Sequence, residues 1–295
     1  MIFNLSKRKK IHVYLWGGLG NQLFIYATAR RLSVVNDAQL VLDTVTGFVR
    51  DKKYRRVYEL HYFHLFQDGI SFRNTEDKLA RFRRRILPFL ERSKPLLKKK
   101  LIKEPQGQIL SDLLHLRLRQ SIFMEGYWQS YSYFADIQEL LRDDLRFRKL
   151  PDQSLSELRQ MIYETQDAVA LHVRRKEYNT AVDKKYYNKA IKLITEKLPS
   201  SHIYCFTDDP VWCSQNICSS FQTNMTLISG KGLSAIADFQ LMASCRHFII
   251  ANSSFSWWAA WIGSQKFKDS IVIMPGYGWW LSKSGNSPAD WIRIN

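Results

Sequence analysis

Short apolar runs alternate with helical stretches along this chain, and this alternation restricts the fold more than any other feature. In the first half, residues 11–16 (IHVYLW) predict a strand, residues 21–33 a helix and residues 40–43 a second strand. The continuous apolar run 168–173 (AVALHV) predicts a buried strand of a parallel sheet. We expect further strands at 201–206, 247–251 and 271–274, and helices at 134–145, 186–198, 233–243 and 256–262. Such alternation is typical of a parallel α/β fold.

The same pattern predicts two Rossmann-like domains. A chain of 295 residues with 45% hydrophobic residues has enough apolar surface for two cores. We place an N-terminal α/β domain at residues 1–160 and a C-terminal, nucleotide-binding Rossmann-like domain at 161–295, because the pattern changes between 150 and 165.

The formal net charge is +17, and much of it lies in the basic segment at residues 78–104 (KLARFRRRILPFLERSKPLLKKKLIKE). Leucine, isoleucine and phenylalanine are interleaved with the charges. The segment is therefore consistent with a solvated helical face and with a surface that rests on anionic lipid. We expect no nucleic-acid partner, because the sequence contains no RNA-recognition motif, zinc-finger spacing or recognition-helix signature.

The sequence predicts a cytoplasmic protein whose membrane contact is peripheral, on the inner face of the cell membrane. No apolar run of signal-peptide length follows the basic start, and none reaches the roughly 18–20 residues that span a bilayer. The cysteines have no CxxC pair and no neighbouring histidine run, so we expect reduced thiols and no metal site at Cys205, Cys213, Cys218 and Cys245.

Polar clusters follow several of the predicted strands, at the edge where open α/β sheets bind ligands. Gly17, Gly18 and Gly20 allow a tight turn and a close approach of a ligand to a helix N-terminus, or they simply turn the chain. Arg174 and Arg175 concentrate positive charge after the strand at 168–173. Arginine forks match pyrophosphate oxygens and can stabilise a departing diphosphate without a metal; the alternative is a surface ion-pair cluster.

Carboxylates and hydroxyls follow two other strands. Asp208 and Asp209 could accept hydrogen bonds from ribose or guanine, or cap the next helix. Asn252, Ser253 and Ser254 could hold a phosphate at a helix N-terminus, or act as an ordinary N-cap.

The aromatic residues divide into two predicted groups. We expect core packing for Trp257, Trp258 and Trp261, which lie at helical spacing. Stacking on a sugar ring is the interpretation for five aromatics in loops that contain glycine, namely Tyr127, Trp128, Tyr277, Trp279 and Trp280.

Taken together, five segments resemble the α-1,2-fucosyltransferases of glycosyltransferase family eleven. They span nearly the whole chain in the family's order and read GGLGNQLFIYA (17–27), GYWQSYSYF (126–134), HVRRKEY (172–178), FTDDPVWC (206–213) and ANSSFSWWAAW (251–261). The resemblance implies a two-domain GT-B-type fold and inverting transfer of L-fucose from GDP-fucose to the 2-hydroxyl of a terminal galactose. It also implies no metal cofactor and a role in bacterial surface-polysaccharide (O-antigen) synthesis.

The resemblance also implies roles for individual residues. Arg174 would hold the diphosphate, and the remaining donor-binding residues would be Asn21, His172, Arg175, Asp208, Asp209, Asp238, Ser253 and Ser254. Glu177 is the candidate general base or, equally, a salt-bridge partner of the arginines. The family reads HxRRGDY where this chain has Lys176 and Glu177, so the carboxylate reaches outward by one more methylene.

Two other functions are consistent with parts of the sequence. One is transfer from a GDP-sugar with a different acceptor or linkage. The other is non-catalytic binding of a polyanion or a membrane, which the charge alone suggests. If the chain only bound a polyanion or a membrane, its basic residues would not need to lie at strand ends. Arg174 and Arg175, however, directly follow a predicted strand.

Overall fold

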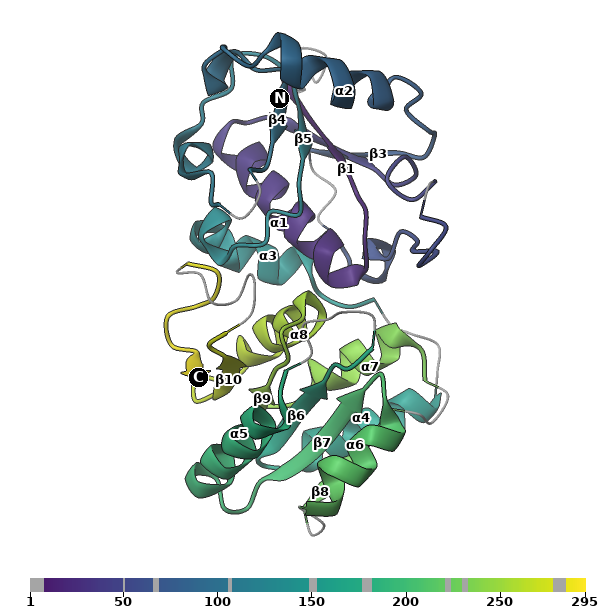
Figure 1. Ribbon diagram of the computed structural model, residues 1–295, viewed down its shortest axis with the longest axis vertical. Helices are drawn as coiled ribbons and strands as arrows, with labels where there is room; N and C mark the ends of the chain where they lie inside the picture. Colours follow the sequence, from purple (N-terminus) through teal and green to yellow (C-terminus); the bar gives the residue numbers. More distant parts are fainter. Residues whose placement is uncertain are drawn as a thin grey trace, which may run out of the picture. The chain divides into compact units, whose positions relative to one another are not determined.

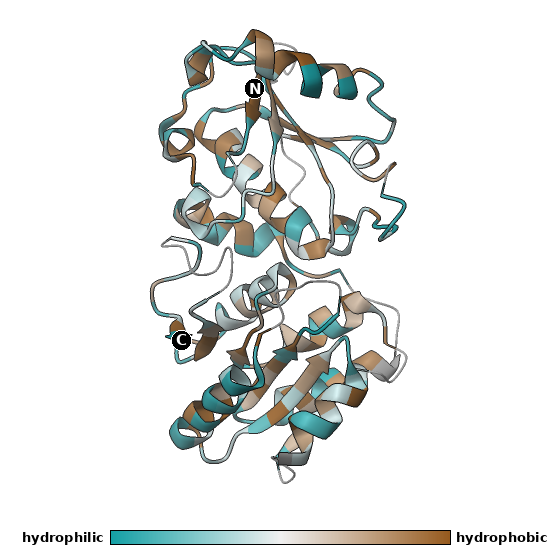
Figure 2. Cartoon of the chain, in the orientation of Figure 1, coloured by the Kyte–Doolittle hydropathy of each residue, from teal (hydrophilic) through white to brown (hydrophobic). Residues whose placement is uncertain are grey.

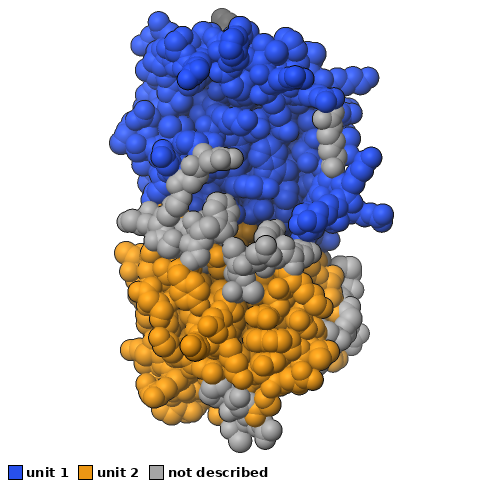
Figure 3. All heavy atoms as spheres, in the orientation of Figure 1, with its two compact units in different colours: residues 1–146 blue, residues 147–295 orange. Residues whose placement is uncertain are grey.

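The computed structural model describes residues 8–49, 51–65, 69–105, 108–148, 153–176, 182–220, 224–229, 233–277 and 285–295 (Figure 1). The chain divides into two compact units, unit 1 at residues 1–146 and unit 2 at residues 147–295 (Figure 3). The division lies before the expected boundary at residue 160. The reason is helix α4 (Gln153–Glu164), which packs against helix α7 (Ala235–Met242) of unit 2.

Unit 1 contains a parallel sheet of five strands in the order β3-β2-β1-β5-β4. The strands are β1 (Lys10–Tyr14), β2 (Gln39–Asp43), β3 (Ile70–Arg73), β4 (Leu101–Lys103) and β5 (Ile122–Glu125). Its α-helices are α1 (Leu19–Val35), α2 (Ala80–Leu90) and α3 (Gln138–Asp144). A buried carboxylate joins two of them, because Asp144 accepts hydrogen bonds from the Tyr26 hydroxyl (2.6 Å) and from Arg30 Nε (3.0 Å).

Three of the strands in unit 1, namely β3, β4 and β5, were not predicted. β3 and β4 are short and carry polar or charged residues, so neither forms an apolar run of the expected length. The predicted helix at 134–145 begins with two 3-10 turns, Tyr131–Tyr133 and Ala135–Ile137, and becomes α-helical only at Gln138.

Unit 2 contains six parallel strands in the order β11-β10-β9-β6-β7-β8. They are β6 (Ala168–Val173), β7 (His202–Thr207), β8 (Met225–Leu227), β9 (His247–Ile249), β10 (Val272–Pro275) and β11 (Ile292–Ile294). The other helices are α5 (Lys184–Lys197), α6 (Pro210–Asn216) and α8 (Ser254–Ser264). This is the doubly wound order of a Rossmann sheet, with its switch point between β6 and β9.

The core of unit 2 explains the apolar runs in the sequence. Every residue of β6 is buried, as expected for a central strand with helices on both faces. The strands of this sheet are strongly hydrophobic, whereas α5 alternates between polar and apolar residues (Figure 2). Trp257 and Trp258 are fully buried and Trp261 is 1% exposed, so the predicted core role of these rings is confirmed. Among the described residues, no helix combines the length and the apolar character needed to cross a bilayer.

Candidate functional site

The switch point of unit 2 gathers most of the predicted polar clusters at one edge of the sheet. Arg174 follows the carboxyl end of β6, and Asp208 follows the carboxyl end of the neighbouring β7. Asn252 and Ser253 follow β9, which pairs with the other side of β6. Open α/β sheets bind ligands in the crevice outside the carboxyl ends of their strands at such a switch point, because helix N-termini and loop N–H groups converge there.

Asp208 organises the basic loop that follows β6. Its carboxylate accepts hydrogen bonds from the backbone N–H groups of Arg175 (2.8 Å) and Lys176 (2.9 Å). The Nε atom of Arg174 also lies 3.1 Å from Asp208 Oδ2. One carboxylate therefore fixes both the loop backbone and the plane of the Arg174 guanidinium, which is the pre-organisation that a phosphate-binding arginine needs.

Arg175 is held by a different contact. Its guanidinium lies over the ring of Trp212, 4.0 Å from the ring centroid, and its Nε is buried. Asp209 caps helix α6 by accepting a hydrogen bond from the Trp212 N–H (3.3 Å). The alternative role for Asp209, a helix cap, is therefore present in the structure.

His172 lies on β6, buried beneath this loop. Burial and the neighbouring charge of Arg174 lower its pKa to about 3, because both disfavour the imidazolium. Its ring packs near Phe255, with centroids 5.8 Å apart. His172 is therefore neutral near pH 7, and among the described residues its Nδ1 atom has no hydrogen-bond partner.

A short hydrogen-bond chain places Asp238 at the same edge. Its carboxylate accepts a hydrogen bond from Ser229 Oγ (2.6 Å), and Ser229 Oγ accepts one from the Thr207 N–H (3.0 Å). Burial raises the pKa of Asp238, and the Ser229 hydrogen bond partly opposes that effect. The other oxygen, Oδ1, is buried and has no partner within the described part of the chain.

Helix α8 supplies an N-terminus at the switch point. Ser253 is the N-cap residue, but its hydroxyl makes no capping hydrogen bond. The first turn of α8 contains no acidic residue, so nothing there neutralises the positive end of the helix dipole. Asn252 Oδ1 is buried without a hydrogen-bond partner in the described residues. This geometry is suited to an anion.

The glycine turn of unit 1 is built around a buried glutamine. Gln22 donates hydrogen bonds to the carbonyls of Gly17 (2.9 Å) and Val57 (2.8 Å), and it accepts one from the Glu59 N–H (2.9 Å). Gly17 has a φ of 73°, a conformation that favours glycine. The predicted donor residue Asn21 is half-buried in the first turn of α1, where Gln129 Nε2 donates to its Oδ1 (2.8 Å).

The prediction that Trp128 stacks on a sugar is wrong, because its ring is fully buried. Tyr127 and Tyr277 remain available, at 39% and 40% exposed. Glu177, Trp279 and Trp280 lie outside the described residues. Sequence reasoning missed Ser229 and Trp212, since a serine after a short strand and a tryptophan in a helix carry no distinctive pattern.

Comparison with known proteins supports one family. The family model described as glycosyl transferase family 11 matches residues 10–276. An alpha-1,2-colitosyltransferase from Escherichia coli is 29% identical, over 95% of this chain and 97% of its own length. The O-antigen biosynthesis glycosyltransferase WbnK from Escherichia coli is also 29% identical, over 95% of this chain and 99% of its own length.

Solved structures share the fold. The fucosyltransferase NodZ from Bradyrhizobium aligns with a TM-score of 0.54 at 16% identity, covering 86% of this chain and 92% of NodZ. A variant of FUT1 from Arabidopsis thaliana, in complex with GDP, aligns with a TM-score of 0.56 at 12% identity, covering 90% of this chain and 70% of FUT1. These likenesses confirm the predicted GT-B-type fold, which contains two Rossmann-like sheets.

Proposed function

Because this chain belongs to glycosyl transferase family 11, it is a glycosyltransferase, and we propose that it moves L-fucose from GDP-fucose to the 2-hydroxyl of a terminal galactose. The observation that carries the donor half of the proposal is the Arg174–Arg175 loop, which Asp208 fixes at the switch point of a Rossmann sheet. A fixed arginine pair at such an edge suits the diphosphate of a nucleotide sugar.

The polar groups around the loop account for the rest of the donor. Asp238 Oδ1 is a buried acceptor that suits the N–H groups of guanine. His172 on β6 is a further candidate nucleotide contact, whereas the carboxylate of Asp209 caps α6. Ser253 and Ser254, at the N-terminus of α8, suit the phosphates. Asn21, in the first turn of α1, is a further proposed donor contact, which the family resemblance alone supports.

The chemistry is a single displacement with inversion. The acceptor oxygen attacks the anomeric carbon of fucose, and the bond from that carbon to the β-phosphate oxygen breaks. The electron pair leaves with GDP, where Arg174 stabilises it in the place of a metal ion. The acceptor proton passes to a carboxylate, for which Glu177 is our candidate.

The linkage and the biological setting rest on the relatives. Galactoside alpha-(1,2)-fucosyltransferases from mammals match parts of the chain, and WbnK is named for O-antigen biosynthesis. We therefore place the reaction in surface-polysaccharide assembly, on the cytoplasmic side of the membrane. The exposed basic and apolar residues of α2 support peripheral contact with anionic lipid.

A donor and acceptor screen tests the proposal. Purified protein is given GDP-fucose, UDP-galactose or GDP-mannose with a panel of galactose-ended glycans, with and without EDTA, and the product linkage is determined by NMR. We expect turnover with GDP-fucose alone, an α-1,2 product, and turnover that persists in excess EDTA. A product with another linkage would contradict the α-1,2 assignment. Loss of turnover in EDTA with rescue by manganese would contradict the metal-free mechanism.

A second donor is favoured by one comparison, the similarity to an alpha-1,2-colitosyltransferase. Colitose lacks the 3-hydroxyl of fucose. The screen therefore includes GDP-colitose in competition with GDP-fucose, and a higher kcat/KM for GDP-colitose would assign this donor in place of fucose.

A further inference from the structure

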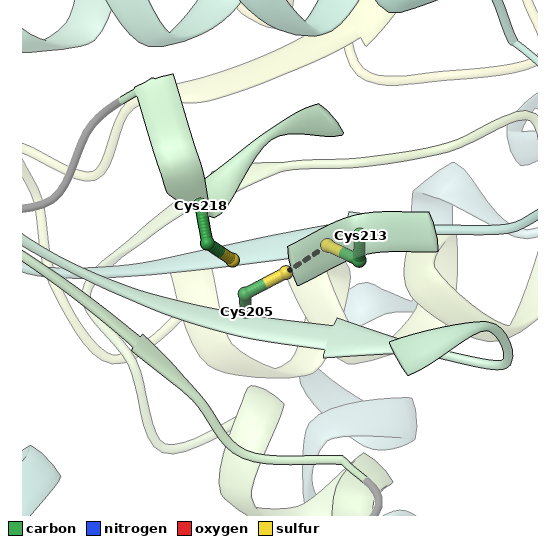
Figure 4. A group of neighbouring side chains, drawn as sticks. All are labelled: Cys205, Cys213 and Cys218. Atoms are coloured by element: carbon green, nitrogen blue, oxygen red, sulfur yellow. Dashed lines mark hydrogen bonds between the residues drawn. The ribbon is translucent and has the colours of Figure 1, made fainter. Parts of the chain in front are cut away.

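Three cysteines converge in unit 2, although their spacing in the sequence matches no metal-binding motif. Cys205 lies on β7, Cys213 on α6, and Cys218 begins the 3-10 turn Cys218–Ser220 that follows α6. Their sulfur atoms all lie within 4.8 Å of one another, and the sulfurs of Cys205 and Cys213 are 3.1 Å apart. Figure 4 shows the three side chains turned toward a common point.

This donor set suits a soft cation. Thiolates select zinc or copper(I) over the hard ions magnesium and calcium. In a tetrahedral zinc site with Zn–S bonds of about 2.3 Å, the sulfurs lie roughly 3.8 Å apart. Shifts of about an ångström would therefore bring these three sulfurs to the spacing of such a site. Cys205 and Cys213 are fully buried and Cys218 is half-buried. A water molecule would therefore reach the ion from the side of Cys218 and serve as a further ligand.

We propose that Cys205, Cys213 and Cys218 bind one thiophilic metal ion, with zinc as the reference ion. Each sulfur that coordinates the ion loses its proton to solvent, so binding is coupled to proton release. Among the described residues this is the one group of cysteine, histidine and acidic side chains that meets the geometry of a metal site. The proposal does not depend on the identity of the sugar donor.

The position of the cluster gives the ion a structural role. A bound ion would tie α6 and the turn after it to β7. α6 carries Trp212, which lies against Arg175, and Asp208 follows the end of β7. The ion would therefore stabilise the two elements that hold the basic loop, while the sulfurs remain in or against the hydrophobic core.

Metal titration of the full chain tests the proposal. Reduced, metal-free protein competes with a chromophoric chelator for zinc, and cadmium is titrated separately to read the sulfur–cadmium charge-transfer absorption. Cys218→Ser removes the half-buried ligand, and Cys245→Ser is the matched control, since Cys245 is a buried cysteine outside the cluster. Circular dichroism verifies that both variants are folded.

We expect one zinc ion per chain in the wild type and in Cys245→Ser, with a higher melting temperature when zinc is bound. Cys218→Ser should bind zinc at least about 100-fold more weakly, since even outer-shell changes at metal sites cost 10–100-fold. The wild-type cadmium absorption decides the question if a variant fails to fold. Absence of that absorption, equal zinc affinity in Cys218→Ser, or a Cys205–Cys213 disulfide in the protein as purified would overturn the proposal.

Discussion

At the residue scale, the adjacent carboxylates of Asp208 and Asp209 have different structural roles. Asp208 accepts hydrogen bonds from two N–H groups of the basic loop and contacts Arg174, whereas Asp209 caps α6. Asn keeps the shape of both side chains but removes the charge, and it is as good an N-cap as Asp. The two Asn variants therefore separate these roles.

We expect Asp208→Asn to weaken GDP binding by about tenfold or more, because a charge-assisted contact to Arg174 and one acceptor of the loop are lost. Asp209→Asn should bind GDP nearly as well as the wild type. Isothermal titration calorimetry with GDP measures both. An equal loss in Asp209→Asn would mean that Asp209 contacts the nucleotide directly.

The second prediction at this scale concerns the two-pronged donation of Arg174. Arg174→Lys retains the charge but loses the fork, and the loss of about 3 kcal/mol of transition-state stabilisation is roughly a hundredfold in rate. We expect kcat/KM for GDP-fucose to fall nearly as far in Arg174→Lys as in Arg174→Ala. A lysine variant with near-normal kcat/KM would exclude a bidentate phosphate contact.

At the element scale, the arginines of α2 fall into two groups, those that form ion pairs and those that are exposed. Arg83 forms an ion pair with Asp77 and lies over the Phe123 ring, and Arg84 pairs with Glu125 (3.1 Å). Arg81 and Arg85 are exposed. Large apolar side chains are exposed beside them: Leu79 (63%), Phe82 (61%), Phe89 (80%) and Leu90 (59%). The basic segment is thus partly structural and partly a free cationic, apolar surface.

We expect the free part of α2 to bind anionic vesicles in a salt-sensitive way. Replacing Arg81 and Arg85 together by Gln should weaken binding to phosphatidylglycerol vesicles by up to about 30-fold, at about 1 kcal/mol per charge. Arg83→Gln is the control, which should lower the melting temperature but not the vesicle affinity. Flotation at low and high salt measures binding. Equal, negligible binding under both conditions would make α2 an ordinary solvated face.

At the scale of the whole molecule, neutral histidines that are partly or fully buried couple the fold to pH. His12 stacks on Phe123, with centroids 4.7 Å apart. Burial, together with the charges of Lys10, Arg73 and Arg83, lowers its pKa to about 4, and Asp43 opposes them weakly. The unfolded chain therefore binds more protons than the folded chain between about pH 4 and the ordinary value of about 6.5. The stability that this group contributes is complete above that window and falls as the pH falls through it.

We expect the urea midpoint of unfolding to decrease between about pH 7 and pH 5 in the wild type. His12→Phe keeps the stacked ring but removes the titration, so its decrease should be smaller. An identical pH dependence in both proteins would show that His12 is not desolvated in the folded state.

Local pattern predicted most of the elements in unit 2, and fewer in unit 1. β6, β7 and α5 are continuous apolar or amphipathic runs, and their predicted bounds lie within a few residues of the observed ones. β4 and β11 have three residues each, too few to show a period. Their pairing with neighbouring strands, rather than their own composition, makes them strands.

The sequence by itself determined the parallel α/β class, the family and the placement of Arg174 at a strand end, because side-chain periodicity and strand-end motifs are local properties of the chain. Only the tertiary structure decided which side chains and backbone groups each residue contacts, and which residues are buried. It assigned Asp208 to the loop and Asp209 to a helix cap, buried Trp128, and brought together Cys205, Cys213 and Cys218. These outcomes depend on contacts between segments distant in sequence, and no local pattern encodes which side chains a fold will place within hydrogen-bonding distance.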